Sequence, residues 1–184
     1  MQICIGITEL SSEFLTKPHM TALQQQLRTR IKIYIWIIII GLFISGATAF
    51  PLETELAYFY RHIQVFPVGM QSWLTTIYEA IRATNAKYPY LSYGTDWLAF
   101  AHLVLAILFI GPLKDPVRNI WVIQFGMIAC VLIFPLAFIA GPIRHIPLFW
   151  RFVDSSFGVI GIVPLWLAYR ATQKLHKQLQ ANHL

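Results

Sequence analysis

The hydrophobic residues of this chain are gathered in four long blocks, not spaced at the period of a surface helix or strand. The blocks cover residues 31–50, 97–113, 120–140 and 152–169. As helices rising about 1.5 Å per residue, blocks of roughly 17 to 21 residues extend about 26 to 32 Å, enough to cross a hydrocarbon core near 30 Å. The pattern predicts an all-α fold: a transmembrane bundle of four helices.

Glycine and proline mark where these helices should stop and restart. Gly111 and Pro112 close the second block, and Gly141 and Pro142 close the third. Asp115 followed by Pro116 offers an N-cap with proline at the first helical position. We therefore expect tight turns on both sides of the third helix.

These signals predict the domain organisation. The four-helix membrane domain should occupy residues 31–170, preceded by a flexible N-terminal extension (1–30) and followed by a cytoplasmic tail (171–184). The four expected spans are residues 31–50, 96–113, 117–140 and 148–169. The long outer loop between the first two spans covers residues 51–95.

The outer loop contains an amphipathic pattern. Apolar residues recur at helical spacing on one face, at Met70, Trp73, Leu74, Ile77, Tyr78 and Ile81. The polar residues Gln71, Thr75, Glu79 and Arg82 fall on the other face. The pattern predicts an amphipathic helix that lies on the outer leaflet or covers the bundle. A small extracytoplasmic cap packed on the bundle is the alternative.

The first block has two interpretations. A start at Met20 would give a basic segment, an apolar core and an A-x-A site at residues 47–49, which is typical of a signal peptide. However, the apolar stretch continues to Phe50, and Gly41, Ser45 and Ala49 form a small-residue face suited to helix packing. We expect a retained span and assign no function to the first 19 residues; the true start codon stays open.

Small residues and prolines inside the other blocks predict where helices approach and bend. Residues expected at helix contacts are Gln124, Gly126, Cys130, Gly158 and Gly161. Pro135 and Pro164 lie within the third and fourth blocks and should kink their helices.

Composition and charge agree with a membrane protein. The chain of 184 residues is 57% hydrophobic and 12% charged, about half the charged fraction of a soluble domain. Its net charge of +6 comes from basic residues beside the ends of the blocks, so we expect no nucleic-acid partner. Nine Lys and Arg residues fall on the side of the termini and five on the other, which predicts that both termini are cytoplasmic. The expected location is a bacterial inner membrane.

The motifs of the common enzyme classes are absent from the sequence. It contains no HExxH, GxSxG, P-loop or GxGxxG segment. None of the six histidines pairs with another at i, i+4, and only His102 lies within a block, which disfavours a metal site or a bis-histidine haem. Cys4 and Cys130 form no redox or zinc motif. We expect no metal and no cofactor.

Four polar residues at the outer ends of the blocks form the candidate ligand-binding pocket: Asp96, His102, Arg151 and Asp154. Ionisable groups inside a membrane are costly and usually face the bundle interior or water. His102 near a carboxylate could move protons or hold a polar head group. Alternatively, Arg151 and Asp154 form an interfacial ion pair, Asp96 interacts with its helix dipole, and His102 is a hydrogen-bonded core residue.

Three segments carry a resemblance to a known family. "YGTDWLAFAH", "DPVRNIWVIQFGMIACV" and "WRFVDSSFGVIG" resemble a family of bacterial four-span integral membrane proteins to which no activity is assigned. The resemblance covers residues 31–170 and implies the four-span fold. A weaker, purely architectural similarity exists to EXPERA-type sterol isomerases and sterol-binding proteins, which implies only that such a bundle can hold a lipid-like ligand.

These observations lead to a hypothesis of function with two alternatives. The chain is expected to bind a small amphipathic or lipid-like molecule in an outward-facing polar pocket. It could instead be an accessory subunit of a larger membrane complex, with a protein partner or a second copy on its small-residue faces. A membrane enzyme acting on a lipid is the third class, and it would depend on His102, Asp96 or Asp154.

Overall fold

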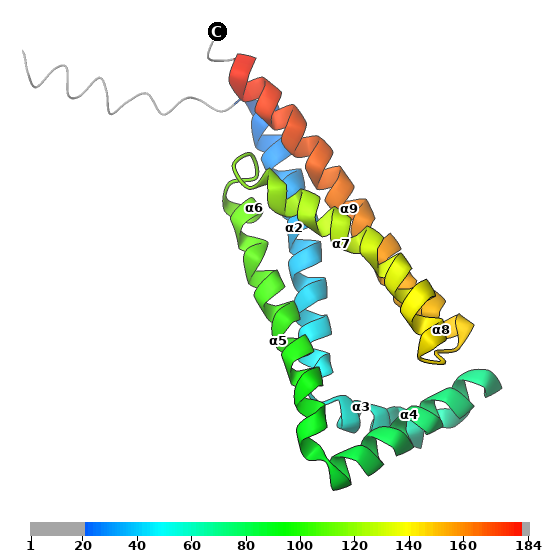
Figure 1. Ribbon diagram of the computed structural model, residues 1–184. Helices are drawn as coiled ribbons and strands as arrows, with labels where there is room; N and C mark the ends of the chain where they lie inside the picture. Colours follow the sequence, from blue (N-terminus) through cyan, green and yellow to red (C-terminus); the bar gives the residue numbers. More distant parts are fainter. Residues whose placement is uncertain (1–20, 182–184) are drawn as a thin grey trace, which may run out of the picture.

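The computed structural model describes residues 21–181, and that part of the chain is built from helices without a strand (Figure 1). Four of its helical stretches are long and apolar enough to cross a membrane: Ala22–Ala49, Pro89–Lys114, Ile120–Ile143 and Leu148–Ala181. The predicted all-α bundle with four membrane-capable helices is therefore confirmed.

Short helices connect or extend the four long ones. In chain order the elements are α2 (Ala22–Ala49), α3 (Leu52–Arg61), η1 (Ile63–Val65), α4 (Val68–Lys87), η2 (Pro89–Ser92), α5 (Tyr93–Leu108), α6 (Ile110–Lys114), α7 (Ile120–Pro135), η3 (Leu136–Ala140), α8 (Gly141–Ile143) and α9 (Leu148–Ala181).

The first and last helices are longer than predicted. A capping box starts α2 at Ala22: the Thr21 hydroxyl accepts a hydrogen bond from the Gln24 N–H (3.3 Å), and the Gln24 side chain accepts one from the Thr21 N–H (3.1 Å). Residues 22–30 of the predicted N-terminal extension are thus helical, and α9 continues through most of the predicted tail to Ala181. Residues 1–20 and 182–184 lie outside the described part of the chain.

The turns around α7 also differ from the prediction. Gly111 and Pro112 lie inside α6, so the second span continues to Lys114. The Asp115 carboxylate accepts a hydrogen bond from the Arg118 N–H (3.1 Å), but this caps a turn, and α7 starts only at Ile120. Gly141 and Pro142 begin α8, since proline needs no N–H partner in a first helical turn.

The bundle has a compact end, which we call the terminal end, where α2 starts, α9 stops and the turn between α6 and α7 lies (Figure 1). Here α2 packs between α5–α6 and α9, and α9 packs between α2 and α7. The buried core joins residues of α2, α7 and α9 with Phe109, which lies between α5 and α6: Leu27, Ile31, Ile35, Phe109, Val122, Ile123, Leu165, Ala168, Ala171 and Leu175.

At the opposite end, the loop end, the helices separate into two pairs, α2 with α5 and α7 with α9 (Figure 1). Close backbone approach holds each pair. A Cβ added at Gly46 would lie 2.8 Å from the Ala99 carbonyl oxygen, and one added at Gly158 would lie 2.6 Å from the Cys130 carbonyl oxygen. Two helices can pack this closely only because glycine has no side chain.

The predicted packing residues are partly correct. Gly126 contacts Phe109 and Leu165, and Gly158 and Gly161 both lie against Cys130, as expected for helix contacts. Gln124 is exposed, and a Cβ added at Gly41 would meet nothing within 4 Å. α2 therefore approaches α5 closely at Gly46, which lies outside the predicted small-residue face of Gly41, Ser45 and Ala49.

Proline has different effects in the two helices that contain it. Pro135 ends the regular part of α7, and the next five residues, Leu136–Ala140, form a π-helix. Proline lacks the N–H that would continue the α-helical ladder, which favours such a change of register. Pro164 lies inside α9, which continues as one α-helix on both sides.

The loop between α2 and α5 is helical and lies across the loop end (Figure 1). α3 and α4 pack on each other and carry the chain away from α2 and back to α5. Trp73 of α4 approaches Trp150 of α9, with ring centroids 6.5 Å apart. α4 thus extends from the α2–α5 pair to the α7–α9 pair.

Candidate functional site

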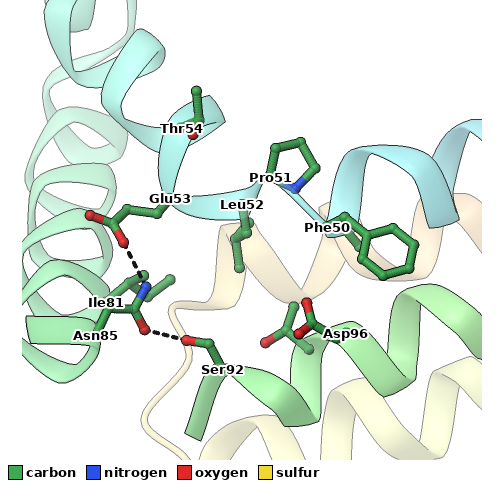
Figure 2. Close-up of a pocket in the computed structure, with 11 residues that line it drawn as sticks. Phe50, Pro51, Leu52, Glu53, Thr54, Ile81, Asn85, Ser92 and Asp96 are labelled. Atoms are coloured by element: carbon green, nitrogen blue, oxygen red, sulfur yellow. Dashed lines mark hydrogen bonds between the residues drawn. The ribbon is translucent and has the colours of Figure 1, made fainter. Parts of the chain in front are cut away.

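A cavity of about 210 Å³ lies at the loop end, where α2, α3, α4 and α5 meet. Figure 2 shows the side chains around it. The walls combine apolar and polar groups: Ala49, Phe50, Pro51, Leu52, Glu53, Thr54, Ile81, Asn85, Ser92, Thr95 and Asp96.

The starts of two helices bring carboxylates to this cavity. Pro51 lies between α2 and α3, and Glu53 falls in the first turn of α3. Asp96 falls in the first turn of α5. Acidic side chains are favoured near helix N-termini because the backbone dipole leaves partial positive charge there. Each position is therefore explained locally, and the fold places both in one corner.

Hydrogen bonds link three elements around the cavity (Figure 2). The Asn85 amide of α4 donates a hydrogen bond of 2.6 Å to the Glu53 carboxylate of α3. The Ser92 hydroxyl of η2 donates one to the Asn85 side-chain oxygen. Because Asn85 uses both its donor and its acceptor, its amide orientation is defined and α3 is held against α4.

The electrostatic character of the cavity is acidic. Glu53 and Asp96 supply two carboxylates, and the described residues that line the cavity include no lysine, arginine or histidine. The remaining polar groups are amide and hydroxyl groups, which are neutral. Such a set attracts a cationic group and can hydrogen-bond to it.

Of the four predicted pocket residues, only Asp96 lines this cavity. His102 lies further along α5, with its Nδ1 2.8 Å from the Leu98 carbonyl oxygen. Its Cβ lies beside Gly46, where α5 packs on α2. His102 therefore interacts with its own helix and its packing partner.

Arg151 and Asp154 lie on α9, in the other helix pair. The Arg151 Nε donates a hydrogen bond of 2.7 Å to the Ile146 carbonyl oxygen, and its side chain packs over Gly141. Asp154 is half-buried one turn further along α9. The structure thus does not bring the four residues together in this cavity, and a ligand-binding role for the set stays a prediction.

The sequence prediction missed Glu53, Asn85 and Ser92 as site residues. A signal for Asn85 exists: it follows Ile77 and Ile81 at intervals of four residues, so it is a polar residue on the apolar side of α4. Glu53 lies at the start of α3 and Ser92 at the end of η2, where polar residues are common, and their pairing with Asn85 depends on how the loop folds back.

A metal centre has no support in the described residues. No group of three or more His, Cys, Asp or Glu side chains between residues 21 and 181 is placed to hold a metal ion.

Comparison of the chain with protein-family models, with curated proteins and with solved structures finds no match in any of the three.

Proposed function

We propose that this chain is a multi-pass protein of a bacterial inner membrane with both termini in the cytoplasm. The support is the distribution of basic residues along the bundle. Among the described residues, the terminal end carries Arg28, Arg30, Lys32, Lys114, Arg118, Arg170, Lys174 and Lys177. The loop end carries Arg61, Arg82, Lys87, Arg144 and Arg151. Excess Lys and Arg marks the cytoplasmic side.

In this orientation α3 and α4 lie at the outer surface. Leu74 of α4 is buried and Trp73, Ile77 and Ile81 are half-buried, whereas Glu79 and Arg82 are exposed. This division supports α4 as an amphipathic helix at the outer leaflet.

The proposed activity is binding of an amphipathic molecule with an amine or other cationic head group. The pair of carboxylates, Glu53 and Asp96, in a cavity without a basic side chain is the observation that carries the proposal. A volume of about 210 Å³ is below the roughly 300–1,000 Å³ of sites that enclose a drug-sized ligand. The head group alone would enter, and the hydrocarbon tail would stay in the lipid.

Thermal unfolding of the purified protein tests this proposal. Dodecylamine, a cation, should raise the unfolding temperature. Dodecanol, which is neutral, and dodecanoate, which is an anion, have the same alkyl chain length and should not raise it. A ligand at 100 times its Kd stabilises by about 2.7 kcal/mol. Asp96→Asn and Glu53→Gln should each weaken the response.

The matched control is Glu79→Gln, which removes a carboxylate from an exposed position of α4. It should leave the dodecylamine response unchanged. An equal response of the wild type to all three dodecyl compounds, or an equal loss in the control, would refute the proposal.

A second candidate function, an accessory subunit, is favoured by one observation. Gly41 lies in the apolar part of α2, where an added Cβ would meet nothing within 4 Å, and Ser45 one turn later is exposed. Such a surface lets another helix approach closely. Purification in mild detergent should then recover a stoichiometric membrane partner that Gly41→Leu releases without lowering thermal stability. Recovery of the wild type without a partner would exclude it.

A further inference from the structure

The turn between α3 and α4 exposes aliphatic side chains. α3 and α4 pack on each other, and we call the turn that joins them, residues 63–69, the hairpin tip. Val65 and Val68 in the tip are 82% and 81% exposed, the highest values among the large hydrophobic residues of the described chain. A single exposed apolar residue is normal, but a short turn that exposes two almost completely offers an apolar surface for contact.

The hairpin tip also carries no charge. The sequence has no Asp, Glu, Lys or Arg between Arg61 and Glu79, a stretch that contains the tip and the first half of α4. The other charged residues of the loop lie at the start of α3 and in the second half of α4: Glu53, Glu55, Arg82 and Lys87. An uncharged, apolar turn beside charged helix segments is the composition expected of a segment that contacts a lipid surface.

Hydrogen bonds within the hairpin satisfy backbone groups of the tip. The Val65 N–H donates to the His62 carbonyl oxygen (3.2 Å). The Gln71 side-chain amide donates a 2.7 Å hydrogen bond to the Phe66 carbonyl oxygen, and Pro67 has no N–H that needs a partner. Unpaired backbone groups are what keep irregular segments out of lipid. The tip can therefore contact an apolar phase without losing these hydrogen bonds.

The hairpin tip lies near the point where two of the spans end. Trp73 in the first half of α4 approaches Trp150, the third residue of α9, and Figure 1 shows the start of α4 close to α8 and the start of α9. Ile143 and Leu148, at the ends of these spans, are 70% and 56% exposed. Tryptophan is enriched at the boundary between hydrocarbon and water. The apolar surface of the tip therefore adjoins the lipid-facing surface of the bundle.

We propose that the hairpin tip inserts Val65 and Val68 into the lipid leaflet at the loop end and thereby anchors the start of α4. The inference rests on the membrane location alone; neither head-group binding in the acidic cavity nor the direction of insertion enters it. The other end of α4 lines that cavity with Ile81 and Asn85, so the anchor also steadies one of its walls.

Spin labelling of the full chain in phosphatidylcholine vesicles tests the proposal. In a background of Cys4→Ser and Cys130→Ala, nitroxides on Val65→Cys and Val68→Cys should collide more with oxygen, which concentrates in lipid, than with a water-soluble nickel chelate. More collisions with the chelate would place the tip in water and overturn the proposal. Shielding from both reagents would mean that a second copy or another protein covers the tip, which would overturn it as well.

Two labelled controls calibrate the measurement. Lys87→Cys, at the exposed opposite end of α4, should favour the nickel chelate. Phe157→Cys, at a residue 64% exposed within the α9 span, should favour oxygen. A Phe157 label in contact with water would contradict the membrane location itself, and this proposal with it. A Phe157 label in lipid combined with a Val65 label in water would refute the anchor alone.

Hydrogen exchange provides a second measurement that needs no apolar label. Val65→Asp should accelerate exchange of the amides at the start of α4 in vesicles by about tenfold or more, because immersion of one valine side chain contributes at least that factor. Ala83→Asp adds the same charge at an exposed position of the same helix and should leave this exchange unchanged. Equal acceleration in both variants, or none in Val65→Asp, would contradict the anchor. If Val65→Asp does not fold, the spin labels still decide.

Discussion

The Asn85 side-chain amide donates a 2.6 Å hydrogen bond to the Glu53 carboxylate, and this bond connects α4 to α3 at the loop end. Asn85 also accepts a hydrogen bond from Ser92 just before α5. One side chain thus connects three elements of the loop, and all three also line the acidic cavity beside Asp96.

Asn85→Ala should therefore loosen α3 from α4. A hydrogen bond to a charged group contributes about 1.5–3 kcal/mol when buried, and less for a half-buried pair, so we expect a loss of about 1–2 kcal/mol. Hydrogen exchange of the α3 amides should accelerate. Ser72→Ala, which removes a hydroxyl bonded only within α4, is the control. Unchanged exchange in Asn85→Ala would mean that the bond does not hold the loop.

Gly46→Ala should destabilise the contact of α2 with α5. The added Cβ would meet the Ala99 carbonyl oxygen at 2.8 Å, and backbone cannot move aside without shifting a helix. Overpacking of this kind costs about 1–3 kcal/mol. Gly41→Ala, five residues earlier on the same helix, meets nothing within 4 Å and should be neutral within about 0.5 kcal/mol. Thermal unfolding of both variants checks this, and equal effects would contradict the observed packing.

The mature protein should retain α2. This helix packs between α5 and α9, and it buries Leu27, Ile31 and Ile35 in the core. Cleavage after Ala49 would remove the helix that joins the two pairs. Intact mass measurement on C-terminally tagged protein from membranes should therefore give a species that includes residues 22–49. A mature chain beginning at Phe50 would disprove the retained span.

Thiol labelling should show the orientation. In a background of Cys4→Ser and Cys130→Ala, a cysteine at exposed Lys87 of the loop should react with a membrane-impermeant maleimide in intact cells. A cysteine at exposed Lys174 should react only after lysis. The opposite pattern would reverse the topology, and it would place the acidic cavity on the cytoplasmic side.

The four membrane-capable helices could be predicted because hydrophobic length is directly visible in a sequence. Which of these helices pack against one another could not be predicted, because a helix surrounded by lipid has no polar face that distinguishes its lipid-facing side from its buried side. Ile35 is fully buried while Ile37 is 50% exposed, although both are isoleucines in one apolar run. The central position of α2 and the separation of the two pairs therefore depend on packing detail such as Gly46.

The same limit applies to the site. The sequence places Asp96, His102, Arg151 and Asp154 at a similar depth, and depth alone does not determine which helices are neighbours. The structure places Asp96 with Glu53 and Asn85, whose proximity depends on how the loop of 45 residues from 51 to 95 folds back. Helix ends were predictable only where a local signal decides them. The Thr21 capping box, one such signal, was missed because the apolar block starts ten residues later.

The most direct test of the proposed binding activity is to identify the lipids that co-purify with the chain from native membranes. Wild type and Asp96→Asn would be isolated in parallel, and their bound lipids identified by mass spectrometry. The account predicts an amine-bearing amphiphile that is enriched with the wild type and depleted from the variant. Identical lipid complements for two equally folded proteins would contradict it.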